Sequence, residues 1–191
     1  FKARSQELKT YFSFPYVFYK PIGIDLSLDL LKYDTLYTVL QRQIGFQYYT
    51  SGINGIKAFY KISTTNLNTV DTNQIRATKQ FPNSNSIQLR QYGIMTNFVN
   101  LDYKFNPRKG YLFESSLSVG IKQILKDNTI SEVRFGPNQY NLYDSSILRT
   151  NQYQYQLKLD YFIPIKERST LKFGLNINQI IAPQIYFNEL Q

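Results

Sequence analysis

The stretch YQYQLKLDYFIPIKERSTLKFGLNINQI, residues 153–180, sorts its side chains by odd and even position. The odd positions up to Ile165, and again from Leu171 to Ile177, are aromatic or aliphatic, whereas most even positions are Gln, Lys, Asp, Gly or Asn. Successive side chains of a β-strand point to opposite faces, so this alternation predicts a hairpin with one apolar face and one polar face.

The same alternation recurs along most of the chain, and no segment shows a convincing helical period. Near residue 100 we assign Val99, Leu101 and Tyr103 to the apolar set. Arg42 interrupts an otherwise apolar set, so it should lie at a rim or beside a register slip, and Pro15 suggests an edge, a bulge or a strand end. Eight strands are expected, at residues 10–19, 23–33, 37–49, 54–64, 88–104, 110–124, 150–164 and 169–182.

The connections between the expected strands alternate in length. Tight polar turns, YKPIG, TSGIN, FNPRKG and KERS, alternate with the short tip YDTLY and two long polar segments, residues 64–86 and 125–151. Long loops at one end of a sheet and tight turns at the other are typical of bacterial outer-membrane barrels, whose tight turns are periplasmic.

Strand length and composition favour a membrane barrel over a soluble β-sandwich. The expected strands have about 10–15 residues, whereas strands of soluble proteins average about five or six and transmembrane strands need about 9–11. The 17 Tyr and 14 Phe suit the aromatic rims of an apolar band, and the polar set suits a wet lumen. We therefore predict an all-β, antiparallel transmembrane β-barrel in the outer membrane, with its apolar face toward lipid.

Composition also narrows the function. The net charge of +9 is spread over single Lys and Arg residues without a basic run, which argues against nucleic acid as a partner. The absence of Cys and His removes Cys/His zinc sites, thiol nucleophiles and His-based triads. We expect no enzymatic activity, no catalytic residues, no cofactor and no metal.

The parity of the loops predicts that residues 1–191 are the middle of one larger barrel domain. If the long loops are extracellular, the first expected strand begins, and the last one ends, on the extracellular side. A complete single-chain barrel ordinarily keeps both termini in the periplasm, so at least one strand is expected to flank each end. Those strands would pair with edges that lipid cannot satisfy.

Three segments carry a resemblance to a known family. VNLDYKFNPRKGYLFESSLSVGIKQI resembles a strand, Pro-x-x-Gly periplasmic turn and strand of the BamA/TamA outer-membrane assembly superfamily, the bacterial surface antigen barrels. FPYVFYKPIGIDLSLDL is similar to an earlier hairpin of these barrels, and APQIYFNELQ to a strand end before the loop with the Arg-Gly-Phe/Tyr motif. The resemblance implies about eight central strands of a sixteen-stranded barrel.

The resemblance also implies a function in folding, inserting or exporting other outer-membrane proteins. The implied partners are client outer-membrane proteins, outer-membrane lipids with lipopolysaccharide, and accessory assembly subunits; POTRA domains would lie outside this chain. A porin-like channel or transporter is the alternative function. A barrel hydrolase of the phospholipase type and a soluble β-sandwich are the remaining rivals.

Several charged residues belong to the polar face of the expected strands and are candidates for a binding or catalytic site. Asp25 and Asp29 lie on one face and could hold calcium or act as an acid/base pair, but a solvated pair balanced by Lys or Arg is the preferred interpretation. A cross-strand charge ladder on the lumen wall is expected to consist of Glu114, Lys122, Lys158, Asp160 and Lys172.

Two loop features are interpreted without a binding role. The order Arg134-Phe135-Gly136 differs from the Arg-Gly-Phe/Tyr motif, so we interpret it as loop packing. SGING is turn material, because it lacks the strand-to-helix setting of a phosphate-binding loop. Lys and Arg in the long loops could contact lipopolysaccharide phosphates, although an ordinary solvated loop is preferred.

Overall fold

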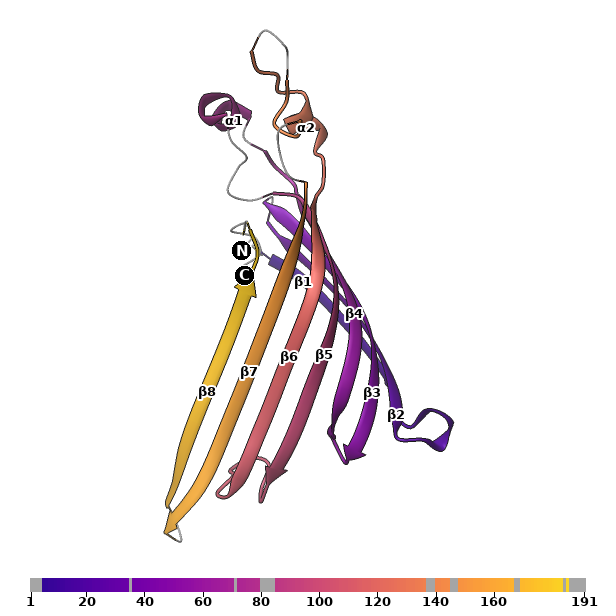
Figure 1. The fold of residues 1–191 in the computed structure, drawn as a ribbon, viewed down its shortest axis with the longest axis vertical. Coiled ribbons are helices and arrows are strands. Elements are labelled where there is room, and N and C mark those ends of the chain that lie inside the picture. The colour runs from indigo at the N-terminus through magenta and orange to yellow at the C-terminus, as the bar shows by residue number, and fades with distance from the viewer. Residues whose placement is uncertain are drawn as a thin grey trace.

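A computed structural model describes residues 5–34, 36–70, 72–79, 85–136, 140–144, 148–166, 169–183 and 185. Its eight strands form one antiparallel sheet in which every strand pairs with its neighbours in sequence (Figure 1). The strands are β1 (Ser5–Phe14), β2 (Ile22–Tyr33), β3 (Tyr37–Ser51), β4 (Asn54–Leu67), β5 (Ile87–Leu101), β6 (Gly110–Ile124), β7 (Arg149–Lys166) and β8 (Ser169–Ile181).

The all-β antiparallel prediction is confirmed, with two corrections to the elements. The first strand was expected at 10–19, but β1 ends at Phe14 and Pro15 follows it, so the proline marks a strand end. Three short helices occur where none was expected: a 3-10 turn, η1 (Val17–Tyr19), and the helices α1 (Thr72–Thr78) and α2 (Asn128–Ser131). Helices of four and seven residues are too short to leave a repeating apolar period.

Cross-strand register sorts the side chains into two faces that run unbroken through the sheet. The apolar face contains rows such as Phe12, Leu26, Ile44, Tyr60, Tyr92, Val119 and Tyr153. The polar face contains the residues between them, including Asp25, Lys57, Gln91 and Lys158. In β5 our assignment was wrong, because the register places Phe98 opposite Phe113 on the apolar face, and Val99 and Leu101 on the polar face.

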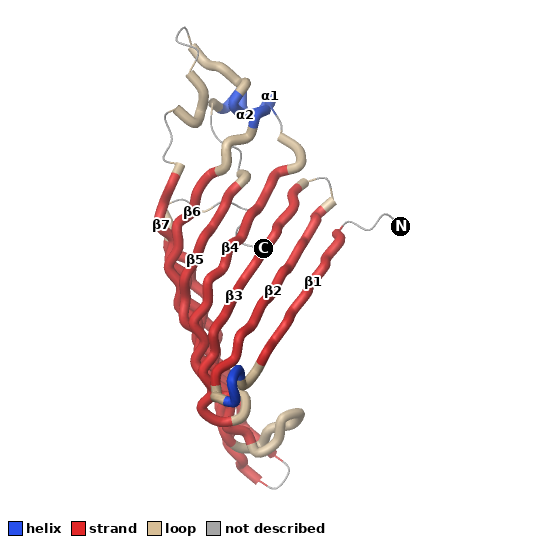
Figure 2. The backbone as a smooth tube through the Cα atoms, turned by 90° about the vertical axis from the view of Figure 1, so that its right-hand side faces the viewer, coloured by secondary structure: helices blue, strands red, loops and turns tan. Residues whose placement is uncertain are grey.

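The sheet is curled but not closed. Figure 1 shows β1 passing behind the middle strands, and Figure 2 shows β1 as a free edge of the sheet; β8 is the other free edge. A hollow of about 700 Å³ lies against the polar face, and side chains from both β1 and β8 line it. The polar face is therefore the concave face of the sheet.

Two long loops pack together at one end of the sheet. We call the described parts of residues 68–86 and 125–148 the cap, the strand ends beside it the cap end, and the other ends the turn end (Figure 1). The cap encloses a cluster of buried apolar side chains at the end of β5 and β6. The members are Ile75, Ile87, Ile124, Ile130, Val133, Phe135, Leu142 and Tyr143, with Val70 and Leu148 partly buried against them.

Candidate functional site

In the cap-end halves of β5, β6 and β7, burial on the two faces of the sheet is the reverse of that in a water-soluble protein. On β6, Leu117 is 60% exposed while its neighbour Ser118 is 6% exposed. On β5, Tyr92 is 65% exposed and Gln91 is 2% exposed. At these positions apolar side chains face away from the protein and polar ones are enclosed by the curl of the sheet.

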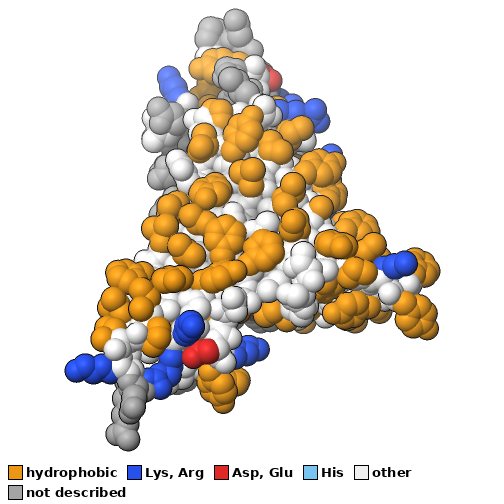
Figure 3. Space-filling model, turned by 60° about the horizontal axis from the view of Figure 1, so that its bottom comes forward, with side chains coloured by type: hydrophobic (Ala, Val, Ile, Leu, Met, Phe, Trp, Pro, Cys, Tyr) orange, Lys and Arg blue, Asp and Glu red, His pale blue; other side chains and the backbone are white. Residues whose placement is uncertain are grey.

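The apolar face has the dimensions of a lipid-exposed band. On β6 it extends from Tyr111 to Ile121, ten residue steps or about 33 Å along the strand. A strand tilted by about 40° would project this length onto about 25 Å, the height of the apolar band of a membrane barrel. Hydrophobic side chains cover much of the face in view in Figure 3, with Lys and Arg toward its margins.

The apolar band ends in a polar boundary near the cap end. Thr64, Gln88 and Gln123 occupy one row across β4, β5 and β6. The next row toward the turn end contains Arg42 and Arg90 on either side of Ile62, and the register beside Arg42 is unbroken. Arg42 was expected either at a rim or beside a register slip, and it lies at the cap-end rim of the apolar band.

The polar face contains a buried ion pair that crosses a strand. Lys57 Nζ on β4 lies 2.7 Å from Asp25 Oδ2 on β2, and Ser13 Oγ donates to Asp25 Oδ1 at 2.7 Å. Between them, Gly45 on β3 leaves room for the lysine chain, since a Cβ atom there would lie 2.9 Å from Lys57 Cδ. Asp25 is thus balanced by a lysine, as preferred from the sequence, rather than paired with Asp29.

Two further ion pairs follow the expected charge ladder. Glu114 lies opposite Lys158 in register, with Oε2 and Nζ 3.5 Å apart. Asp160 Oδ1 lies 3.0 Å from Lys172 Nζ on the adjacent strand. Both pairs lie on the polar face, which confirms the ladder for these four residues. Lys122 lies on the same face and is buried, nearer the cap end.

Asp29 is also on the polar face, where Lys9 and Lys61 are its charged neighbours. Among the described residues no group of three or more Asp or Glu side chains could hold a metal ion. Asp29, like Asp25, thus lies beside basic side chains on the polar face.

The cap was missed by sequence analysis, which treated both long segments as solvated loops. Phe135 is buried in the cluster, pairs with Tyr140 through a β-bridge, and has its ring centroid 5.9 Å from that of Tyr140. This contact confirms the interpretation of Arg134-Phe135-Gly136 as loop packing. Asp127 begins α2 by accepting hydrogen bonds from the N–H groups of Thr129 and Ile130, a signal that the sequence does contain.

At the turn end, one carboxylate organises the β5–β6 turn. Asp102 Oδ1 accepts hydrogen bonds from the backbone N–H groups of Tyr103, Arg108 and Lys109 at 2.9, 2.9 and 3.1 Å. These donors, Lys109 first, lower the pKa of Asp102. Asp102 was expected within a strand, but β5 ends one residue before it.

No helix among the described residues is long and apolar enough to cross a membrane. Comparison of the chain with protein family models, with curated proteins and with solved structures gives no match.

Proposed function

We propose that this chain forms part of the wall of an integral transmembrane β-barrel in the bacterial outer membrane. Its apolar face would contact lipid and its polar face would line a lumen. The supporting observation is the reversed burial of sequence neighbours, such as exposed Leu117 beside buried Ser118. Lipid cannot satisfy free backbone groups, so β1 and β8 would each pair with a further strand.

We propose further that the barrel belongs to the BamA/TamA type and folds, inserts or exports outer-membrane proteins. The support is the sequence of the β5–β6 hairpin, residues 99–124, with its Pro107-Arg108-Lys109-Gly110 turn. In this function the partners are client outer-membrane proteins and accessory subunits, and the barrel wall needs no catalytic group.

A porin-like channel or transporter is the second candidate. It is favoured by the hollow against the polar face, which is lined by Glu7, Lys9, Asp29 and Lys61 together with glutamine side chains. A solute path requires such a polar, charged lining. Depletion of the full-length protein separates the two functions, because an assembly factor would lower the levels of other outer-membrane proteins, whereas a channel would change only solute uptake.

Neighbouring cysteine substitutions test the membrane orientation, since the chain has no cysteine of its own. In native membranes, Leu117→Cys should resist a membrane-impermeant maleimide while Ser116→Cys, on the polar face, reacts. After solubilisation in a mild detergent at low concentration, the maleimide reaction of both cysteine variants should be measured again, with a protein of known fold as the reference. Equal reaction of the two cysteines in intact membranes, together with monodisperse protein in plain buffer, would support a soluble β-sandwich instead.

A further inference from the structure

The carboxylates of the eight strands all lie on one face of the sheet, whereas basic side chains occur on both faces. All five carboxylates within the strands, Glu7, Asp25, Asp29, Glu114 and Asp160, lie on the polar face. The charged side chains that the register places on the apolar face are all basic, and four of them lie toward the cap end. They are Lys32, Arg42, Arg90 and Arg149.

Arg42 and Arg90 form the closest arrangement of these basic residues. They lie in one row on β3 and β5, separated by Ile62 on β4. Strands are about 4.8 Å apart, so the two Cα atoms are about 10 Å apart, and two long arginine side chains can reach one group between them. Neither arginine forms an ion pair among the described residues.

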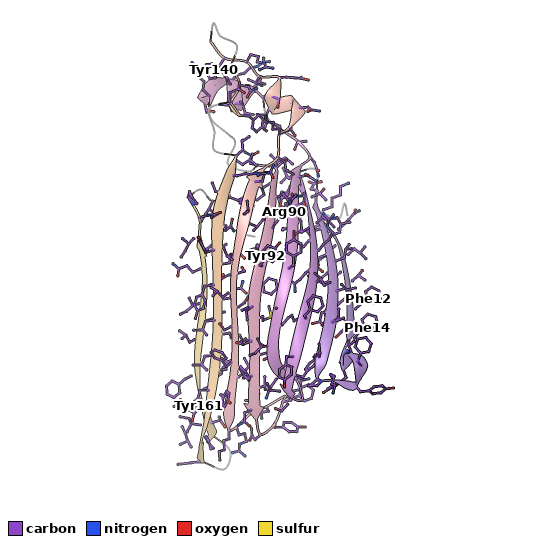
Figure 4. All side chains as sticks on the ribbon, turned by 45° about the vertical axis from the view of Figure 1, so that its right-hand side comes forward. Phe12, Phe14, Arg90, Tyr92, Tyr140 and Tyr161 are labelled. Atoms are coloured by element: carbon purple, nitrogen blue, oxygen red, sulfur yellow. The ribbon has the colours of Figure 1, made fainter. Side chains whose placement is uncertain are left out.

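The surroundings of the two arginines are polar on one side and aromatic on the other. Toward the cap end, Gln88 Oε1 accepts a hydrogen bond from Arg90 Nε at 3.0 Å, which orients the guanidinium group. Toward the turn end, the rings of Tyr60 and Tyr92 lie 4.7 Å apart. Figure 4 shows Arg90 nearer the cap than Tyr92. Tyrosine at this level marks the headgroup region of a membrane protein.

We propose that Arg42, Arg90 and Gln88 bind the phosphate group of a membrane lipid on the outside of the sheet. Guanidinium groups bind phosphate through paired hydrogen bonds, and here no carboxylate on the same face competes for them. Tyr60 and Tyr92 share one row of the apolar face. This row and the apolar rows that follow it toward the turn end would contact the acyl chains. The site rests on the proposed membrane function and places an anionic leaflet at the cap end.

Native mass spectrometry of the detergent-purified, full-length protein tests the site with phosphatidic acid as the probe. Diacylglycerol with the same acyl chains is the control lipid, because it lacks only the phosphate. The wild type should retain phosphatidic acid in preference to diacylglycerol. The double variant R42Q/R90Q should bind phosphatidic acid at least about tenfold more weakly, since each basic residue contributes to attraction of an anionic headgroup.

Two further variants sharpen the result. Lys32→Gln removes a basic residue from the same face, three strands away from Arg90 and about 13 Å along the strands from Arg42, and should change binding by less than about twofold because distant sites act independently. R42K/R90K keeps the charge without the paired donors and should restore part of the binding. Unfolding midpoints equal to that of the wild type would show that the variants are folded.

Three outcomes would overturn the site: unchanged binding by R42Q/R90Q, an equal loss in Lys32→Gln, or displacement of the lipid by excess inorganic phosphate. The third would mean that the headgroup alone is recognised. Equal retention of both lipids by the wild type would also reject the site while leaving the membrane function in place. Retention of neither lipid, by protein that is monodisperse without detergent, would instead reject the proposed function itself.

Discussion

The sheet and the cap bury opposite kinds of side chain. In the cap, Ile130 is fully enclosed by other apolar side chains, and exposed positions such as Arg76 are polar. In the sheet, Gln152 is buried and the adjacent Tyr153 is half exposed. The cap therefore buries apolar side chains and exposes polar ones, as proteins do in water, and the sheet does the reverse. Such a difference is expected of a protein whose regions meet different solvents.

The sheet and the cap are also stabilised by different interactions. The sheet depends on backbone pairing along seven strand pairs and on ion pairs across its polar face, with only one layer of side chains on each face. The cap depends on an apolar cluster contributed by two loops. Substitutions should consequently affect the two regions through different interactions.

The largest effect is expected from Lys57→Met on the polar face. It leaves the carboxylate of Asp25 buried without its cation, which should lower the free energy of unfolding by about 3–5 kcal/mol. Lys158→Met is the matched control, because both partners of that pair are about half exposed, and it should cost about 0–1 kcal/mol. Denaturant unfolding of the full-length protein in micelles measures both values.

A double variant strengthens this test. K57M/D25N removes the uncompensated charge and should recover part of the loss, since the amide can keep a hydrogen bond with Ser13. If Lys57→Met and Lys158→Met lowered the free energy of unfolding by similar amounts, burial of Asp25 would not be what makes its ion pair important for stability.

Ile130→Ala should loosen the cap by about 2–5 kcal/mol, the usual cost of a cavity in an apolar cluster. The measurement is hydrogen exchange of the Phe135 amide, which donates to Tyr140 O at 2.9 Å. Leu117→Ala on the apolar face is the control and should leave this amide protected. Faster exchange in both variants would show that cap and sheet open together rather than as separate regions.

Leu117→Arg should cost about 2–4 kcal/mol in a lipid bilayer, because it places a charge on the apolar face near the middle of the band. Ser116→Arg puts the same residue on the polar face and should cost clearly less. Unfolding by urea in lipid vesicles compares the two variants. The opposite ranking would mean that the polar face, and not the apolar face, contacts lipid.

The hairpins with strict alternation were the most predictable part of the molecule. β6 begins at Gly110 and ends at Ile124, as expected, because apolar and polar residues alternate without interruption from Ser116 to Lys122 and with few exceptions, such as Leu112 and Ser115, before that. In β5 the alternation is mixed: Leu89, Met95 and Val99 lie on the polar face, so periodicity alone selected the wrong face near residue 100. Cross-strand register, which requires the fold, resolves the ambiguity.

Other features depend on contacts between distant segments. The cap requires Ile75 and Ile130 to meet across 55 residues of sequence, and no local pattern reports that contact. The pair of Lys57 and Asp25 depends on Gly45 of the strand between them. The two-arginine row was visible only as one misplaced residue, Arg42, until the register placed Arg90 beside Ile62.

The smallest effect is expected at the turn end, which belongs to neither the cap nor the apolar band. The pKa of Asp102 is lowered in the folded state by backbone N–H donors, mainly that of Lys109. A carboxyl group whose pKa is lower in the folded state stabilises the fold above its unfolded pKa, and this contribution is lost as the pH falls through the folded value. Acidification below about pH 4 should therefore loosen the β5–β6 turn.

Hydrogen exchange of the Arg108 and Lys109 amides, followed from neutral to acidic pH and corrected for intrinsic exchange, measures this effect. Asp102→Asn should exchange faster at neutral pH and lose most of the pH dependence, since the amide accepts hydrogen bonds more weakly than a carboxylate. The Phe135 amide in the cap is the internal control, because Asp102 lies at the opposite end of the strands. A pH dependence that persists unchanged in Asp102→Asn would assign it to other carboxylates and leave the turn held by backbone pairing alone.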